Sequence, residues 1–196
     1  MTESQPNDSA SSWTLWGGLA ILGIIGLVVV LVSASLEPLM GKGAWAIRGA
    51  LHGTTASLFM VTATIGLFQA YRIAAGKAWN VVELQLGSVL NAAMAGLTVL
   101  SGNWIYIPYR APEGPRSYFL SASPEIHKVF FEFKEFAALF TFPLAVTAAY
   151  LLLRYGGDLY RRRGLSTIVA VLLVLVFFYF IVAFGLGAAI TKLQSV

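Results

Sequence analysis

The chain has 196 residues, of which 58% are hydrophobic and 11% are charged. Soluble domains carry roughly one quarter charged residues, so this composition excludes an ordinary soluble domain and predicts a protein embedded in lipid. The net charge of +4 does not indicate nucleic-acid binding, because the basic residues cluster at the ends of apolar runs, where they act as topology signals. The absence of cysteine excludes disulfides, thiolate zinc sites and covalently attached c-type haem.

Several apolar runs are long enough to cross about 30 Å of hydrocarbon at about 1.5 Å per residue. They cover residues 14–35, 46–71, 79–102, 125–154 and 165–190. The sequence therefore predicts an all-α membrane protein, a bundle of about five transmembrane helices. A polar N-terminal tail at 1–13 is followed by a single domain over 14–196.

The connection 103–123 is longer than the others, and we predict it to be an aromatic, proline-rich loop. Long loops of this kind in compact proteins are usually functional or act as ordered lids. The alternative is an aromatic belt that lies at the lipid headgroups. At its end Ser123, Pro124 and Glu125 supply a helix cap, a first-turn proline and an acidic first turn, so the fourth helix is predicted to begin there.

The distribution of basic residues suggests an orientation. One side carries the triple arginine between the last two spans together with other cations: Arg72, Lys77, Arg154, Arg161, Arg162 and Arg163. Positive charge favours the cytoplasm, although the opposite side is also basic. We predict an integral, multi-pass protein of a bacterial inner membrane, with its N-terminus cytoplasmic.

The spans differ in polarity. The first span and the last one, between Leu165 and Ile190, are uniformly apolar and are predicted to face lipid. The third span carries a small and polar stripe at helical spacing: Glu83, Gly87, Asn91, Ala95 and Thr98. Such a stripe is suited to close helix packing and interhelical hydrogen bonds. A dedicated ligand site is the alternative.

The chain has two histidines, His52 and His127, and both lie near helix starts on the same predicted side. Two facing histidines can hold one haem b through their neutral imidazoles, and Arg48, one turn from His52, could pair with a haem propionate. Counting from Arg72 and Arg154 places the two histidines about 10 Å apart in height, whereas ligands of one haem must be nearly level. The alternative for each is an interfacial residue bonded to a neighbour.

The fourth span begins with a charged segment over 125–135. Lys128, Glu132 and Glu135 share one helix face, so they could form an ion-pair ladder. In the functional interpretation Glu132 or Glu135 exchanges protons or binds a quinol hydroxyl. The candidate proton or quinol site comprises Asn91, Glu132, Lys134 and Glu135.

The segments R-G-A-L-H-G, from Arg48 to Gly53, and E-I-H-K, from Glu125 to Lys128, resemble small membrane-bound b-type cytochromes in architecture. The predicted size is also similar to the single-chain membrane anchors of succinate dehydrogenases, but a diheme anchor would require four histidines. The resemblance implies one haem b near the non-cytoplasmic face, with His52 and His127 as its axial ligands.

These observations suggest a membrane electron-transfer protein, a subunit of a respiratory or photosynthetic complex linked to the quinone pool. It would be a non-catalytic redox subunit of an oxidoreductase, with haem b and quinone as cofactors and with other membrane or periplasmic redox subunits as partners. The alternative is a cofactor-free structural subunit or a small transporter that uses the charges of Lys128, Glu132 and Glu135.

Overall fold

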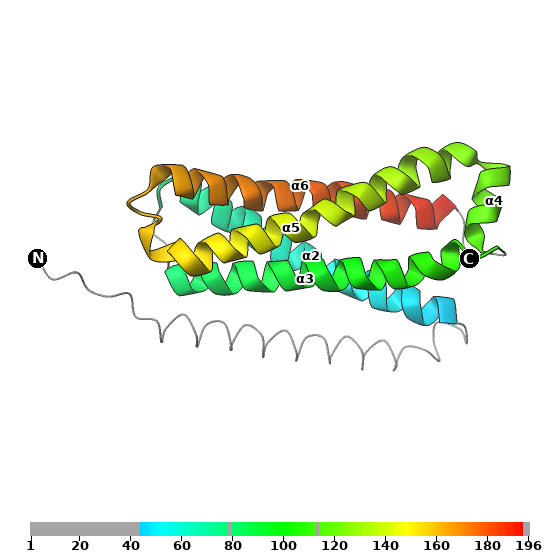
Figure 1. The fold of residues 1–196 in the computed structure, drawn as a ribbon, viewed down its shortest axis with the longest axis horizontal. Helices are drawn as coiled ribbons and strands as arrows, with labels where there is room; N and C mark the ends of the chain where they lie inside the picture. Colours follow the sequence, from blue (N-terminus) through cyan, green and yellow to red (C-terminus); the bar gives the residue numbers. More distant parts are fainter. Residues whose placement is uncertain (1–43, 78–79, 113, 194–196) are drawn as a thin grey trace, which may run out of the picture.

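The computed structural model describes residues 44–77, 80–112 and 114–193, and these contain helices and no strand. Within these residues four segments are long and apolar enough to cross a membrane, which confirms the predicted all-α membrane class. Their helices are α2 (Ala44–Ala74), α3 (Val81–Tyr109), α5 (Glu132–Tyr155) and α6 (Arg163–Leu193) (Figure 1). The predicted tail at 1–13 and first span at 14–35 lie outside the described residues.

The four long helices form a ring in which neighbours along the chain run in opposite directions. Helix α2 packs against α3 and α6, and α5 packs against the same two helices. The short helix α4 (Pro115–Ala122) covers one end, which we call the α4 end (Figure 1). The turns after α2 and α5 lie at the other end, which we call the arginine end because it contains 161–163.

Local sequence determines where α2 stops and α3 starts. Gly76 has a φ of 62°, a left-handed conformation that glycine adopts without strain, and it reverses the chain after α2. The Asn80 side chain then accepts a hydrogen bond of 2.9 Å from the backbone N–H of Val82 and caps α3. Arg72 and Glu83 join the two helices through an ion pair of 3.0 Å.

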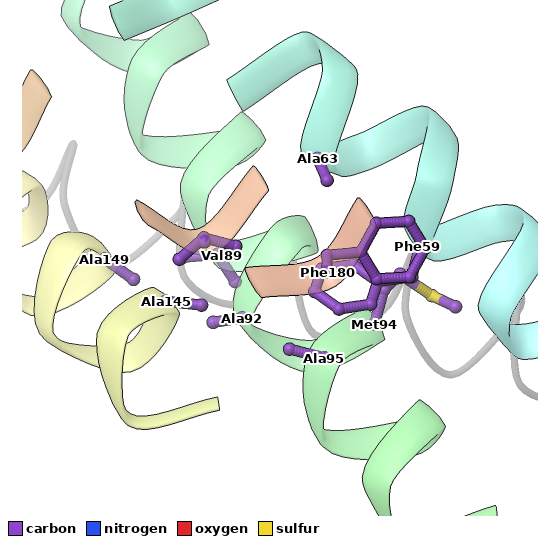
Figure 2. Packing of buried hydrophobic residues seen from close by; sticks show 10 residues of the cluster. Phe59, Ala63, Val89, Ala92, Met94, Ala95, Ala145, Ala149 and Phe180 are labelled. Atoms are coloured by element: carbon purple, nitrogen blue, oxygen red, sulfur yellow. The ribbon is translucent and has the colours of Figure 1, made fainter. Parts of the chain in front are cut away.

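The centre of the bundle contains an apolar layer, the Phe59 layer, formed by Phe59, Met94, Ala95 and Phe180. Phe59 and Phe180 come from α2 and α6, and their ring centroids are 4.4 Å apart (Figure 2). All four side chains are at most 3% exposed. The layer is therefore dry and separates polar groups on its two sides.

The last helix is more deeply packed than predicted. One face of α6 is buried between α2 and α5, with Val169, Leu173, Val176, Phe180 and Ala183 in the core. The other face remains exposed and includes Ile168, Val171, Val174 and Phe178. The prediction that this span faces lipid therefore holds for one face only. A uniformly apolar helix fits a protein core as well as lipid.

The segment 103–123 is mostly helical rather than a loop. Helix α3 continues to Tyr109, and a turn then leads to α4, which starts after Gly114. Pro108 lies in the last turn of α3, and because proline lacks the N–H that an α-helix needs to continue, the helix ends one residue later. The fourth span does begin at Pro124, as predicted, but its first turns form a π-helix, η1 (Ile126–Phe131), that runs into α5.

Candidate functional site

Four ionisable side chains from three helices gather toward the α4 end of the bundle. We call them the α4-end cluster: His52 on α2, Tyr106 on α3, and Lys134 and Glu135 on α5. Lys134 interacts electrostatically with both His52 and Glu135, and the Glu135 carboxylate interacts with the Tyr106 hydroxyl. Ionisable groups within membrane spans are costly and mark ion or substrate pathways by default.

Lys134 and Glu135 are adjacent in sequence but turn toward different helices. The Lys134 stem lies against α6 at Gly187, where an added Cβ would be 3.4 Å from Lys134 Cε. Its ammonium lies 5.0 Å from the centre of the Phe131 ring, which is within range of a cation–π interaction. Glu135 turns toward Tyr106 on α3. The pair therefore connects groups on both sides of α5.

His52 is held against α3 by a hydrogen bond and by close packing. Its Nδ1 lies 3.2 Å from Ser101 Oγ, which in turn lies 3.0 Å from Thr55 Oγ1. An added Cβ at Gly102 would approach His52 Cε1 to 3.1 Å, so glycine makes room for the ring. This packing keeps the imidazole between α2 and α3.

His127 is the centre of a second group, the His127 latch, which also contains Tyr109 and Arg116. Its side chain is buried, Nδ1 lies 3.0 Å from the Tyr109 hydroxyl, and Arg116 Nε donates to Nε2 over 3.1 Å. Arginine can only donate, so Nε2 accepts and the proton resides on Nδ1, which donates to Tyr109. A neutral imidazole of defined tautomer thus ties α4 to α3 and η1.

Aromatic packing supports the latch. The rings of Tyr109 and Phe131 stack with centroids 4.4 Å apart and an interplanar angle of 2°. Phe119 of α4 is buried beside them, with Ile190 of α6 in the same cluster. Helix α4 therefore packs against the end of the bundle through Phe119.

The two predicted haem ligands contact α3 at different levels. His52 contacts Ser101 and His127 contacts Tyr109. These positions are eight residues apart in the sequence, or about 12 Å along a helix axis, an offset in keeping with the height difference expected from the sequence. Both ring nitrogens of His127 are also engaged. This arrangement does not fit one haem between the two rings, and the shared haem stays a prediction.

The other predicted site residues fall in separate places. Lys134 and Glu135 both belong to the α4-end cluster, whereas the Glu132 side chain is 60% exposed and its Oε1 lies 3.9 Å from His127 Nε2. Asn91 lies elsewhere, buried between α2 and α3. Arg48 stacks on Trp104, with its guanidinium 5.4 Å from the ring centre.

The predicted ion-pair ladder does not form among the described residues. Of the ion pairs within 4.0 Å in that part of the chain, none joins Lys128 to Glu132 or Glu135. Lys128 and Glu132 are both exposed, and Glu135 turns toward Tyr106 instead. Sharing a helix face permits such pairs but does not require them, because exposed pairs gain little free energy.

Sequence reasoning missed Tyr106, Tyr109, Arg116 and Ser101 as site partners. Tyr106 and Tyr109 are spaced by three residues, which places them on one face of a helix. That signal becomes visible once α3 is continued beyond 102. Arg116 had no comparable signal, because its role depends on the fold of α4 back onto η1.

Comparison with family models, with curated proteins and with solved structures gave no match.

Acidification should loosen α4. A protonated His127 would direct an N–H at the Arg116 guanidinium, and the neighbouring cations Arg110 and Lys128 add to the repulsion, while only Glu132 is attractive. Because the chain has no cysteine, a spin label on Ser121→Cys reports on α4 alone. We expect its mobility to rise as the pH falls below about 6.5, the ordinary pKa of histidine.

The same label in His127→Gln should show no such pH response, because glutamine does not titrate, whereas His52→Gln should retain it. An unchanged pH response in His127→Gln would show that the latch does not hold α4.

Proposed function

We propose that this chain is a small proton-coupled membrane transport protein and that protons exchange at the α4-end cluster. The observation that carries the proposal is the convergence of Lys134, Glu135 and Tyr106 with His52 inside segments able to cross a membrane. Charged and titratable side chains in such positions commonly serve proton relays and substrate paths.

The cluster can couple a proton to an anion. While Glu135 is ionised, its negative charge balances Lys134. A proton that reaches Glu135, with the Tyr106 hydroxyl as its neighbour, removes that balance. The Lys134 ammonium is then available to an anionic solute, so binding of the anion and the proton favour each other. We therefore propose a small anion as the substrate class, carried together with a proton.

The charge of the α4 end supports an anionic substrate. Basic side chains outnumber acidic ones among the described residues of this end. The basic ones are Arg48, Arg110, Arg116, Lys128 and Lys134, and the acidic ones are Glu125, Glu132 and Glu135. A surface of one predominant sign raises the local concentration of ions of the opposite sign. Helix α4 and its latch would control access to the cluster.

We further propose that the arginine end faces the cytoplasm of a bacterial inner membrane, which places the α4 end outside. The cations at the arginine end support this orientation. Reporter fusions after Arg163 and within 110–114 test it.

Electron transfer is the second proposal. It is favoured by one observation, that His52 and His127 lie toward the same end of the bundle. In this arrangement both ring nitrogens of His127 are engaged in hydrogen bonds, which argues against a shared haem. The absorbance spectrum of the chemically reduced protein tests this proposal. The narrow bands of six-coordinate haem b, lost in His127→Ala, would establish a haem bound by His127.

Proton uptake into liposomes tests the transport proposal. The purified protein is reconstituted with a pH-sensitive dye inside, and inward gradients of chloride, phosphate or succinate are applied. We expect anion-dependent acidification of the lumen that is at least about tenfold slower in Glu135→Gln. Glu125→Gln, which removes an exposed carboxylate at the start of the same span, should leave it unchanged. Equal rates in both variants would refute the assignment of Glu135.

A further inference from the structure

At the α2–α3 interface two buried side-chain amides each have one polar atom with a hydrogen-bond partner and one without. Asn91 and Gln69 are each 1% exposed. Asn91 Oδ1 accepts a hydrogen bond from Thr62 at 3.4 Å, and Gln69 Nε2 donates one to the Glu83 carbonyl at 3.2 Å. The remaining atoms, the donor Asn91 Nδ2 and the acceptor Gln69 Oε1, have no hydrogen-bond partner among the described residues. Buried polar atoms without partners are rare in folded proteins.

The two amides lie about one helical turn apart along the interface. Asn91 Nδ2 would be 3.2 Å from a Cβ added at Gly66, and Gln69 Oε1 would be 3.0 Å from a Cβ added at Gly87. Gly66 is three residues from Gln69 on α2, and Gly87 is four residues from Asn91 on α3. The amides therefore occupy adjacent turns, about 5 Å apart along the axis.

Reversing the amides does not remove the problem. If Asn91 is turned over, its oxygen takes the place of the unpartnered nitrogen. If Gln69 is turned over, its oxygen faces the Glu83 carbonyl, which cannot donate. In the orientation that the structure shows, a third group that accepts from Asn91 Nδ2 and donates to Gln69 Oε1 satisfies both atoms.

We propose that an internal water molecule binds between Asn91 and Gln69, accepting from Asn91 Nδ2 and donating to Gln69 Oε1. Water supplies both a donor and an acceptor from one atom, and buried waters typically bridge polar groups that the protein leaves without a partner. The proposal stands on these two amides and does not depend on the transport proposal.

The water extends the polar groups of the arginine end toward the membrane centre. Gln69 contacts the backbone of Glu83, which pairs with Arg72 at the end of the bundle. Beyond Asn91, toward the α4 end, the α2–α3 interface is apolar at the Phe59 layer. On the other side of this layer Thr55, Ser101 and His52 form the next group of polar side chains. The α2–α3 interface thus contains two polar halves separated by a dry layer.

Radiolytic labelling of the reconstituted protein in ¹⁸O-water tests the site, because hydroxyl radicals formed from a bound water oxidise the side chains beside it. A Cβ added at Gly66 would lie 3.2 Å from Asn91 Nδ2 and 3.6 Å from Leu173 Cδ2. Leu173 therefore borders the proposed water site and should be labelled. Met94, a more reactive side chain buried in the Phe59 layer, should not be labelled. Absence of label on Leu173, or label on both residues, would overturn a discrete water site.

Two variants make the test specific. Asn91→Leu removes the donor, and Gly66→Ala places a methyl group against Asn91 Nδ2 while it keeps both amides. Each should reduce the labelling of Leu173 at least fivefold. Undiminished labelling in a folded variant would contradict the proposal, and the comparison of Leu173 with Met94 in the wild type remains decisive if neither variant folds.

Discussion

Replacing Lys134 by methionine should reduce anion-dependent proton uptake at least about tenfold while the protein remains folded. Methionine keeps an unbranched apolar stem against Phe131 and α6 but removes the ammonium that interacts with His52 and Glu135. Without this cation the cluster cannot hold an anion when Glu135 is protonated. Proton uptake into liposomes and the circular dichroism of the same preparation measure activity and fold separately.

Lys128→Met is the matched control. Lys128 precedes Lys134 on the same span, but its side chain is exposed, and its removal should change proton uptake less than twofold. If both variants lost activity equally, the effect would arise from the general charge of the α4 end and not from the cluster.

Gly114→Ala should destabilise the protein by about 1–3 kcal/mol and release α4. An added Cβ would lie 2.5 Å from the carbonyl oxygens of Pro108 and Tyr109 and 3.0 Å from that of Ala111. These are backbone atoms of the last turn of α3 and of the turn that follows it, so they cannot move without distorting the end of the helix. Thermal unfolding and the mobility of a spin label at Ser121→Cys should both report the change.

Gly157→Ala provides the control for this substitution. Nothing lies within 4 Å of a Cβ added at Gly157, in the turn between α5 and α6. Its unfolding free energy should stay within about 0.5 kcal/mol of the wild type. A similar loss of stability in both variants would mean that glycine flexibility, and not the crowded turn, accounts for the effect at Gly114.

The long helices were predictable because each consists of an apolar run bounded by caps or basic residues. The predicted fourth span, 125–154, corresponds closely to η1 and α5. Pro124 marks its start as expected, since proline favours the first turn of a helix. The π-helical geometry of η1 was not predicted.

The segment 103–123 was misjudged because its prolines and polar residues resemble a loop. Pro108 stops α3 only one residue later, and Pro115 starts α4. What turns this segment into helices is the burial of Tyr109 and Phe119 against η1 and α6. Such tertiary contacts override local signals and are not visible in the sequence.

The site was predictable in part. Lys134, Glu135, His52 and His127 stood out as polar residues in apolar surroundings, which is a reliable signal within a membrane span. Their partners depend on helix rotation and depth. Lys134 and Glu135 face different helices although they are adjacent, and His52 and His127 contact α3 at different levels.

Infrared difference spectroscopy of the reconstituted protein tests proton exchange at Glu135 most directly. A carboxylic acid has a C=O stretching band that a carboxylate lacks, so a pH titration in the membrane reports protonation of individual carboxyl groups. We predict that the acid-minus-alkaline spectrum contains such a band, that Glu135→Gln removes it, and that Glu125→Gln leaves it in place. A spectrum that is the same in Glu135→Gln and in the wild type would contradict proton exchange at this residue.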